Sequence, residues 1–305
     1  MTEGIEVRSR GYAGESDLRL LENFLVASMV ARPPHTYWHL GNLLWSMFFS
    51  LQYDPCRDVR IWEDEQGRVL GFAWFDAPNA VDLQIAPRLR GTGLLETPML
   101  AWAAEHARAF EQSGEPRLWT SALGGDAEYT RYLTEHGFER AAPSMVRMLR
   151  ELDAGIPRGE LPAGWTVRPV GDEDEWSERV AAHREVWHPS RVTVEAYRRL
   201  RAAPGYLPTL DFAAVAPDGA IASYCICWLD PGNRVGLFEP VGTRPAYRRR
   251  GLSRAVLQEA LQRLVAYGAR MAFVSTNVQN DPAIKLYRAV GFRIVETEFR
   301  YSKRF

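Results

Sequence analysis

The sequence predicts an α/β protein of two tandem domains, each a mixed, mostly antiparallel sheet flanked by helices. The first observation is alternation, because stretches of period two, typical of strands, alternate with stretches of period 3.6, typical of helices. The second is an internal repeat: Val7-Arg8 and Gly91 recur 160 residues later as Val167-Arg168 and Gly251. This offset far exceeds the period of solenoid repeats, so the repeating unit is a whole domain.

Length and composition set the domain boundaries. With 305 residues, 46% of them hydrophobic and 25% charged, the chain is globular in composition and long enough for about two domains. Residues 154–164 are rich in glycine and proline, which is typical of a linker. We therefore expect one domain over residues 1–153 and a second over residues 165–305, each with the element order β-α-α-β-β-β-α-β-α-β-β.

The first domain opens with an alternating strand and an amphipathic helix, and Pro33-Pro34 ends that helix. A hairpin pattern follows, since two strand-like runs flank the turn residues 65–67. The elements predicted for this domain are strands at 5–9, 59–63, 69–75, 81–85 and 117–121 and helices at 17–30, 35–51 and 129–136.

The second domain repeats this order with different turn residues. A hairpin is predicted about Asp218-Gly219, and a long helix begins at Leu252 and ends before Gly268 as a C-terminal cap. A shorter helix runs from the capping residue Asn280 to Gly291. The other predicted elements are strands at 165–169, 211–216, 221–228, 235–243 and 271–275, helices at 172–186 and 193–203, and a closing strand pair at 293–305.

The turn between the strand at 235–243 and the helix at Leu252 is dense in arginine. It brings Arg248 to Ser253 to a helix N-terminus, where free N–H groups and the helix dipole favour an anion. Gly251 allows close approach of that anion to the backbone. The pattern is neither of the common phosphate loops, G-x-x-x-x-G-K-[ST] and G-x-G-x-x-G. A solvated turn that merely precedes a helix is the plain alternative.

Two motifs resemble the GNAT acetyltransferase superfamily. Arg248-x-x-Gly251-x-Ser253 is similar to the family's [Arg/Gln]-x-x-Gly-x-[Gly/Ala] turn, although Ser253 replaces the usual glycine or alanine. Asn280-x-x-Ala283-x-x-Leu286-Tyr287-x-x-x-Gly291-Phe292 is similar to the family's last helix. The resemblance covers the C-terminal half. It implies the GNAT fold, acetyl-CoA as co-substrate, and acetyl transfer to the primary amine of a small molecule.

The resemblance assigns roles to residues of the second domain. It implies that the turn binds the diphosphate, that the end of the strand pairs with the pantetheine arm, and that Tyr287 is the general acid. We expect Glu239, on the same strand, to be the general base, with a surface or acceptor-binding carboxylate as the alternative. Pro240, which follows it, would mark the splayed bulge that is typical of the family. Tyr287 could instead be a core residue. The expected cofactor-binding residues are Val241, Gly242, Thr243, Arg248, Arg249, Arg250, Gly251, Leu252, Ser253, Arg254, Asn280, Ala283 and Tyr287.

The first domain carries a weaker copy of both motifs. Its turn is shorter, and Thr97-Pro98 predicts a later helix start, so the amides of residues 91–93 would no longer lie at the helix N-terminus. Leu133 stands where the second domain has Tyr287, and Asp126 stands in the Asn280 position, where it would repel phosphate. We therefore expect a degenerate copy that serves structure or shapes the acceptor site.

The segment 35–51 is the most aromatic in the chain. We favour a core or interdomain helix, because bulky apolar residues usually pack, over the wall of an acceptor pocket that the family topology would allow. His35 and His39 are spaced i, i+4 but lack a third metal ligand. Cys225 and Cys227 have no second pair and fit small buried residues better, so we expect no metal.

Charge and hydropathy limit the partners. The net charge of −1 provides no broad basic field for nucleic acid or membrane. Lys285 and Lys303 are the two lysines among 37 basic residues. The abundance of arginine therefore reflects a coding bias, and any single arginine is weaker evidence for a binding site. No run reaches 18 apolar residues and no signal core opens the chain, which favours a cytoplasmic protein. A homodimer stays open.

Two other functions stay open from the sequence. The chain could be a non-catalytic acyl-CoA-binding or structural protein made of decayed copies. A peptide acetyltransferase would need an acidic groove, and no acidic run supports one. The cluster at 172–175 would suit a polyamine acceptor but equally suits a solvated helix start.

Overall fold

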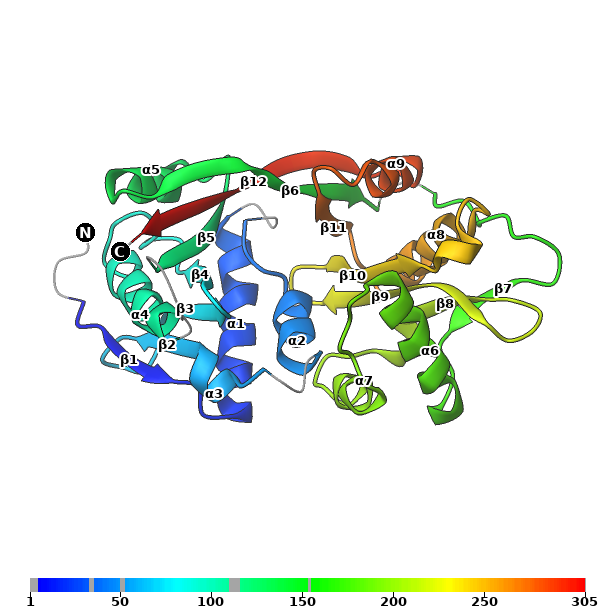
Figure 1. The fold of residues 1–305 in the computed structure, drawn as a ribbon, viewed down its shortest axis with the longest axis horizontal. Coiled ribbons are helices and arrows are strands. Elements are labelled where there is room, and N and C mark those ends of the chain that lie inside the picture. Colours follow the sequence, from blue (N-terminus) through cyan, green and yellow to red (C-terminus); the bar gives the residue numbers. More distant parts are fainter. Residues whose placement is uncertain (1–4, 33–35, 50–52, 110–115, 153–154, 305) are drawn as a thin grey trace. The chain divides into compact units, whose positions relative to one another are not determined.

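The computed structural model describes residues 5–32, 36–49, 53–109, 116–152 and 155–304 (Figure 1). The chain divides into two compact units. The first unit comprises residues 1–38, 53–147 and 296–305, and the second comprises residues 39–52 and 148–295. The units and the two expected domains therefore differ in three segments, since 39–52 and 148–153 belong to the second unit and 296–305 to the first.

The first unit is a mixed sheet covered by helices. Its strand order is β1-β2-β3-β4-β5-β12-β6, and β4 and β5 form its parallel pair. Its elements are β1 (Arg8–Gly11), α1 (Glu15–Ala31), α3 (Pro55–Asp58), β2 (Val59–Glu63), β3 (Val69–Asp76), β4 (Ala80–Ile85), α4 (Glu96–Arg108), β5 (Arg117–Leu123), α5 (Ala127–Glu135) and the larger parts of β6 (Glu139–Glu151) and β12 (Arg293–Arg304).

The second unit is a sheet of order β6-β11-β10-β9-β8-β7, to which β6 contributes its last residues. Strands β7 to β10 are antiparallel, whereas β10 and β11 are parallel. Its elements are α2 (Leu40–Phe48), β7 (Thr166–Pro169), α6 (Glu173–Val186), α7 (Val194–Arg201), η1 (Pro208–Leu210), β8 (Asp211–Val215), β9 (Ile221–Asp230), β10 (Val235–Thr243), η2 (Pro245–Tyr247), α8 (Leu252–Ala266), β11 (Met271–Asn277) and α9 (Asp281–Ala289).

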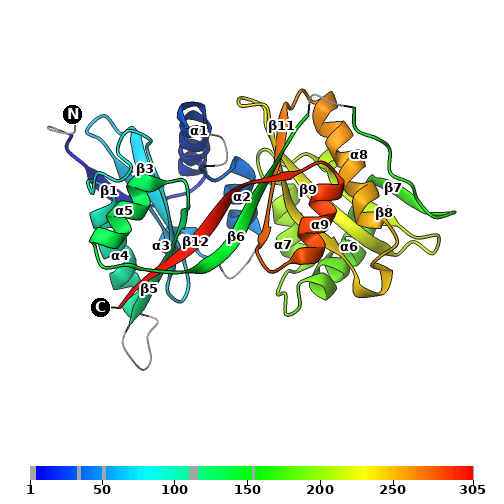
Figure 2. The same cartoon turned by 90° about the horizontal axis from the view of Figure 1, so that it is seen from above.

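The central strands of the second unit are buried on both faces. All five residues of β8 and nearly all of β9 are buried, because helices cover the sheet on either side (Figure 2). Helix α8 packs on one face, while α2 and α6 pack on the other. This double burial explains why β9 is an almost continuous apolar run and not an alternating one.

The strands and helices expected from the sequence are confirmed, with end points that move by a few residues. The exceptions are the two strands expected at the end of each half: the first half ends in the single strand β6, and the expected strand pair at 293–305 is wrong because one long strand, β12, takes its place. The reason is local. The span 293–304 contains no glycine, proline, asparagine or aspartate, so nothing in it favours a tight turn.

Candidate active site

Strands β10 and β11 separate within the second unit. They pair over three residues only, from Val235 opposite Met271 to Leu237 opposite Phe273, although both strands continue beyond this point. On the other side of β10, the register against β9 shifts between Phe238 and Val241. This irregularity confirms the bulge expected at Glu239-Pro240. It leaves the β11-facing edge of the last part of β10 without a strand partner among the described residues.

The arginine turn, residues 244–251, connects this edge to helix α8. Gly251 has φ +78° and caps the helix without any side-chain hydrogen bond to the first-turn N–H groups. Arg249 also has positive φ, at +61°. Both conformations curl the backbone tightly before the helix. The turn therefore presents free N–H groups at a helix N-terminus, as the sequence predicts.

The arginines of this turn face solvent. Arg248, Arg249, Arg250 and Arg254 are exposed, and within the described ranges none of them has a carboxylate within 4.0 Å. Arg244 differs, because it is bound by Glu178 at 2.6 Å and by Glu185 at 3.0 Å. The guanidinium groups beyond Arg244 are thus available to an anionic ligand.

A cluster of three hydroxyl groups connects the start of α8 to strands β9 and β10. The Ser223 hydroxyl lies 2.9 Å from the Thr243 hydroxyl and 3.3 Å from that of Ser253, and Thr243 and Ser253 also bond directly. The Ser223 hydroxyl also contacts the Gly242 carbonyl oxygen at 2.9 Å. Ser253, which departs from the family's usual glycine or alanine, therefore ties the start of α8 to β9 and β10.

Tyr287 lies on α9, on the side of the sheet to which Cys225 points. Its ring packs edge-on against Phe292 with centroids 6.1 Å apart, and it is 6% exposed. Burial raises the pKa of Tyr287 well above its ordinary value, and the nearby Cys225 and Glu239 add to the rise. The phenol is therefore neutral at physiological pH. Its hydroxyl has no hydrogen-bond partner in the described part of the chain.

Asn280 and Ala283 shape the beginning of α9. The Asn280 side chain accepts a hydrogen bond from the Ala283 N–H at 3.3 Å, which confirms Asn280 as the helix cap. Asn280 is exposed and Ala283 half-buried, so both border the space beyond the end of β11. Their contact with a cofactor stays a prediction.

Glu239 lies in the bulge of β10 and is half-buried. Its carboxylate accepts a hydrogen bond from the side-chain amide of Asn42 on α2. Its backbone oxygen accepts one from the Trp228 indole at 2.7 Å. Asn42 was not among the residues expected from the sequence. The pattern His39-x-x-Asn42 before an apolar run does signal a capped helix, but it does not reveal which sheet the helix joins.

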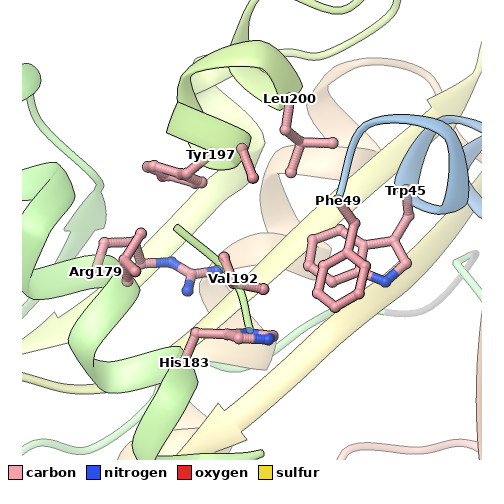
Figure 3. A pocket seen from close by; sticks show the side chains of 9 residues that line it. Trp45, Phe49, Arg179, His183, Val192, Tyr197 and Leu200 are labelled. Atoms are coloured by element: carbon pink, nitrogen blue, oxygen red, sulfur yellow. The ribbon is translucent and has the colours of Figure 1, made fainter. Parts of the chain in front are cut away.

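A pocket lies on the α2 and α6 side of the same sheet (Figure 3). Trp45 and Phe49 close it from α2, with ring centroids 4.6 Å apart. The remaining lining residues come from α6, α7 and the segments next to them: Arg179, Val180, His183, Val192, Ala196, Tyr197 and Leu200. The aromatic segment thus both packs on the sheet and lines a pocket. His35 and residues 50 and 51 lie outside the described residues.

The polar groups around the pocket are largely satisfied. The Arg179 guanidinium is paired with the buried carboxylate of Asp211 at 3.4 Å, and the Tyr197 hydroxyl donates to the same carboxylate at 2.5 Å. Burial, helped by Arg179, lowers the pKa of His183 to about 3, so its ring is neutral. His183 Nδ1 lies 3.1 Å from the Tyr224 hydroxyl. The pocket therefore offers rings and a neutral imidazole.

The known proteins that this chain resembles are acetyltransferases, in agreement with the site described above. Residues 173–292 match the model of the acetyltransferase (GNAT) family. The chain carries a GNAT acetyltransferase domain. It is also 27% identical over 260 residues to a mycothiol acetyltransferase of Saccharomonospora viridis, covering 79% of this chain and 81% of that protein. A mycothiol acetyltransferase of Thermobifida fusca is 29% identical over 273 residues, covering 78% and 80%. The chain is therefore an acetyltransferase.

Solved structures extend the likeness of fold beyond the GNAT domain. A GCN5-related N-acetyltransferase from Sphaerobacter thermophilus has a TM-score of 0.67 at 21% identity, over 98% of this chain and 95% of the other. A tandem GNAT protein from the clavulanic acid biosynthesis pathway has a TM-score of 0.68 at 16% identity, over 98% of each chain. The tandem GNAT fold thus covers both halves.

The first unit contains the counterpart of the turn that opens α8 in the GNAT domain. Here the buried carboxylate of Glu96 accepts hydrogen bonds from the N–H groups of Gly91 at 2.5 Å and Gly93 at 3.0 Å. Helix α4 begins at Glu96 with Leu95 as its cap, so the expected cap at Thr97 is wrong. Glu96 therefore binds N–H groups of the turn that precedes α4, while the cap residue Leu95 makes no side-chain hydrogen bond to the helix.

The other charges of this first-unit turn, residues 87–96, are also used internally. Arg90 pairs with the buried carboxylate of Asp126 and lies over the Tyr129 ring, 4.4 Å from its centroid. Asp126 also caps α5 by accepting from the Tyr129 N–H at 3.4 Å. Asp126 is thus neutralised by Arg90 and not left facing the turn. Tyr132 bonds its hydroxyl to that of Thr97 at 2.7 Å.

The described residues show neither a metal-ion site nor a membrane-spanning helix. Within the described ranges, no group of three or more histidine, cysteine or acidic residues is placed to hold a metal ion. Cys225 and Cys227 are buried on β9. None of the described helices is both long and apolar enough to span a bilayer.

Proposed function

We propose that the second unit transfers the acetyl group of acetyl-CoA to the primary amine of a small molecule by direct attack. The observation that carries the proposal is the open arginine turn beside the separated ends of β10 and β11, with Tyr287 on one face of the sheet and Glu239 on the other. Acetyltransferases of this family use acetyl-CoA. In this proposal the first unit is a degenerate copy that binds none.

The arginine turn would hold the diphosphate of acetyl-CoA. Its free N–H groups from Gly251 to Arg254 and the positive end of α8 favour a doubly charged anion. The exposed guanidinium groups of Arg248, Arg249 and Arg250 add charge-assisted hydrogen bonds. Since neither set of groups is occupied by an acidic side chain, the residues present fit the ligand.

The pantetheine arm would follow the unpaired edge of β10 from Thr243 to Val241 as an added strand. This edge has no strand partner among the described residues because β11 has already separated from it, and the Thr243 carbonyl oxygen accepts a hydrogen bond from Arg248 Nε at 3.3 Å. Extended ligands bind such edges through main-chain hydrogen bonds. One N–H of this stretch would stabilise the oxyanion, a contribution commonly worth about 10²- to 10³-fold in rate.

Two residues, Glu239 and Tyr287, carry out the two proton transfers of the proposed reaction. The acceptor arrives as an ammonium ion, and Glu239, directly or through water, takes its proton so that the nitrogen lone pair can attack the thioester carbon. The attacking nitrogen then loses its second proton to solvent, and the carbon–sulfur bond breaks. Tyr287, whose raised pKa keeps the phenol neutral, donates a proton to the leaving thiolate. Solvent afterwards restores the proton to Tyr287 and removes one from Glu239.

A calorimetric titration with acetyl-CoA tests the binding half of the proposal. We expect one site per chain in the wild type and none in Gly251→Asp, because the new carboxylate would repel the diphosphate. Gly219→Asp is the matched control: Gly219 has φ +89° in a hairpin turn of the same unit, and an added Cβ there would meet nothing within 4 Å. Two sites per chain would mean that the first unit also binds.

Turnover is tested by the release of free CoA thiol in the presence of a panel of amines. The panel should include 2-phenylethylamine, glucosamine, spermidine and cysteine, which differ in charge and ring character. Acetylation of any member supports the proposal. Binding of acetyl-CoA without turnover of any amine would favour the alternative, a non-catalytic acyl-CoA-binding protein. The homologous mycothiol acetyltransferases narrow the reaction class but do not by themselves name the acceptor of this chain.

A further inference from the structure

Helix α2 comes from the first half of the sequence but belongs to the second unit. Its cap, His39, is 1% exposed, and its Nε2 atom lies 3.2 Å from the Val235 carbonyl oxygen on β10. Gly41 sits so close to β9 that an added Cβ would come within 2.3 Å of Trp228 Cγ. These contacts fix α2 directly on the two strands that form the proposed active site.

Asn42 is held in one orientation by its own helix. Its Oδ1 atom accepts a hydrogen bond from the His39 N–H at 2.9 Å, as part of a capping box. This bond decides which end of the amide is oxygen, so the Nδ2 group faces the other way and donates to Glu239 Oε2. A rigid donor thus fixes the rotamer of the proposed base.

We propose that Asn42 is a positioning residue for Glu239, because its side-chain amide holds the carboxylate of the proposed base in one orientation. The inference rests on the function proposed above. Asn42, Trp45 and Phe49 are spaced i, i+3 and i+7, so they share one face of the helix. The face that orients Glu239 therefore also lines the pocket. The isolated stretch 165–305 lacks this helix and therefore lacks the Asn42 contact to Glu239.

Three substitutions separate positioning from folding. Asn42→Asp keeps the oxygen of the capping box but replaces the donor to Glu239 with a carboxylate, whereas Asn42→Ala removes both contacts. Leu43→Val is the control, since Leu43 is buried in the same helix and only packs. Turnover is measured at saturating acetyl-CoA with the panel amine that releases most thiol, alongside the dissociation constant of acetyl-CoA and the melting temperature.

We expect the turnover number to fall about 10- to 100-fold in Asn42→Asp, the range of a hydrogen bond to a charged group, with acetyl-CoA affinity unchanged. Leu43→Val should lower the melting temperature without this loss. In a Glu239→Gln background, Asn42→Asp should cause no further loss, because it acts through Glu239. Multiplicative losses in the double variant would overturn the inference.

The test distinguishes two kinds of failure. If Glu239→Gln retains full turnover, the proposed base is wrong and this inference falls with it. If Glu239→Gln loses turnover while both Asn42 variants keep it, the inference alone is overturned. A double-mutant cycle on chemical unfolding, using Asn42→Ala and Glu239→Gln, needs no acceptor. The inference requires a non-zero coupling, and independent effects of the two substitutions would contradict it.

Discussion

The two halves of this chain carry nearly the same turn motif, and the structure gives the two turns opposite states. In the first-unit turn, Glu96 occupies the N–H groups of Gly91 and Gly93, and Arg90 is paired with Asp126. In the arginine turn, the helix N-terminus has no side-chain cap. A motif match therefore does not establish an anion site. A turn of this kind can bind an external anion only if no carboxylate of the chain already occupies its N–H groups.

The largest effect should come from the tyrosine that differs between the units. We expect Tyr287→Phe to lower the turnover number by about 100-fold, within the range typical of general acid catalysis, with acetyl-CoA affinity unchanged. Tyr132→Phe is the matched change in the first unit and should leave turnover intact, since Tyr132 only bonds Thr97. Steady-state kinetics at saturating acetyl-CoA check both. Equal losses in the two variants would contradict the division of roles.

The arginines should show the next largest contrast. Arg248→Ala should weaken acetyl-CoA binding about tenfold, because one charge-assisted hydrogen bond to the diphosphate is lost. Arg88 is its counterpart in the first unit and is also exposed, so Arg88→Ala should leave binding unchanged. Titrations at low and high salt check this, since the arginine contribution should shrink as salt screens it. A similar effect of both substitutions would point to general charge and not to the turn.

Removing the Glu96 carboxylate tests whether it is the group that keeps acetyl-CoA from binding at the first-unit turn. Glu96→Ala leaves two N–H groups without their acceptor, so we expect the free energy of unfolding to fall by about 1 to 3 kcal/mol. Acetyl-CoA should still bind at one site per chain, because Arg90 remains paired with Asp126. Urea denaturation and calorimetry give the two quantities. A second acetyl-CoA site in this variant would show that Glu96 alone kept the first unit from binding.

The sequence predicted local features well and long-range ones poorly. Strand and helix positions, the bulge at Glu239-Pro240 and the cap at Asn280 follow from nearby residues, and the structure confirms them. Asn42 was missed because its partner lies 197 residues away, and no periodicity encodes that pairing. Glu96 was missed for a different reason. A glutamate in a first helical turn is ordinary, and only the curl of residues 91–93 makes it a ligand of the backbone.

Acid should lower the stability of the second unit more than that of the first, and this effect is smaller than those above. Two buried neutral histidines lie in the second unit: burial lowers the pKa of His39 to about 4 and, with Arg179, that of His183 to about 3. Both bind protons near pH 6.5 once unfolded. Between pH 6.5 and 4 the unfolded state therefore holds more protons, so stability falls as pH falls, by about 1 kcal/mol per pH unit for each histidine.

His183→Gln should remove part of this slope, and Gln66→Ala, which changes an exposed residue of the first unit that does not titrate, serves as the control that should not. Urea unfolding at pH 6.5, 5.5 and 4.5 measures the slope for each variant. The comparison is sharpest if fluorescence from a tryptophan of each unit is followed separately. Trp228 reports on the second unit and Trp62 on the first, and both are buried. If the second unit is the acid-sensitive one, its transition moves first, whereas a common shift in both would assign the acid effect to groups other than His39 and His183.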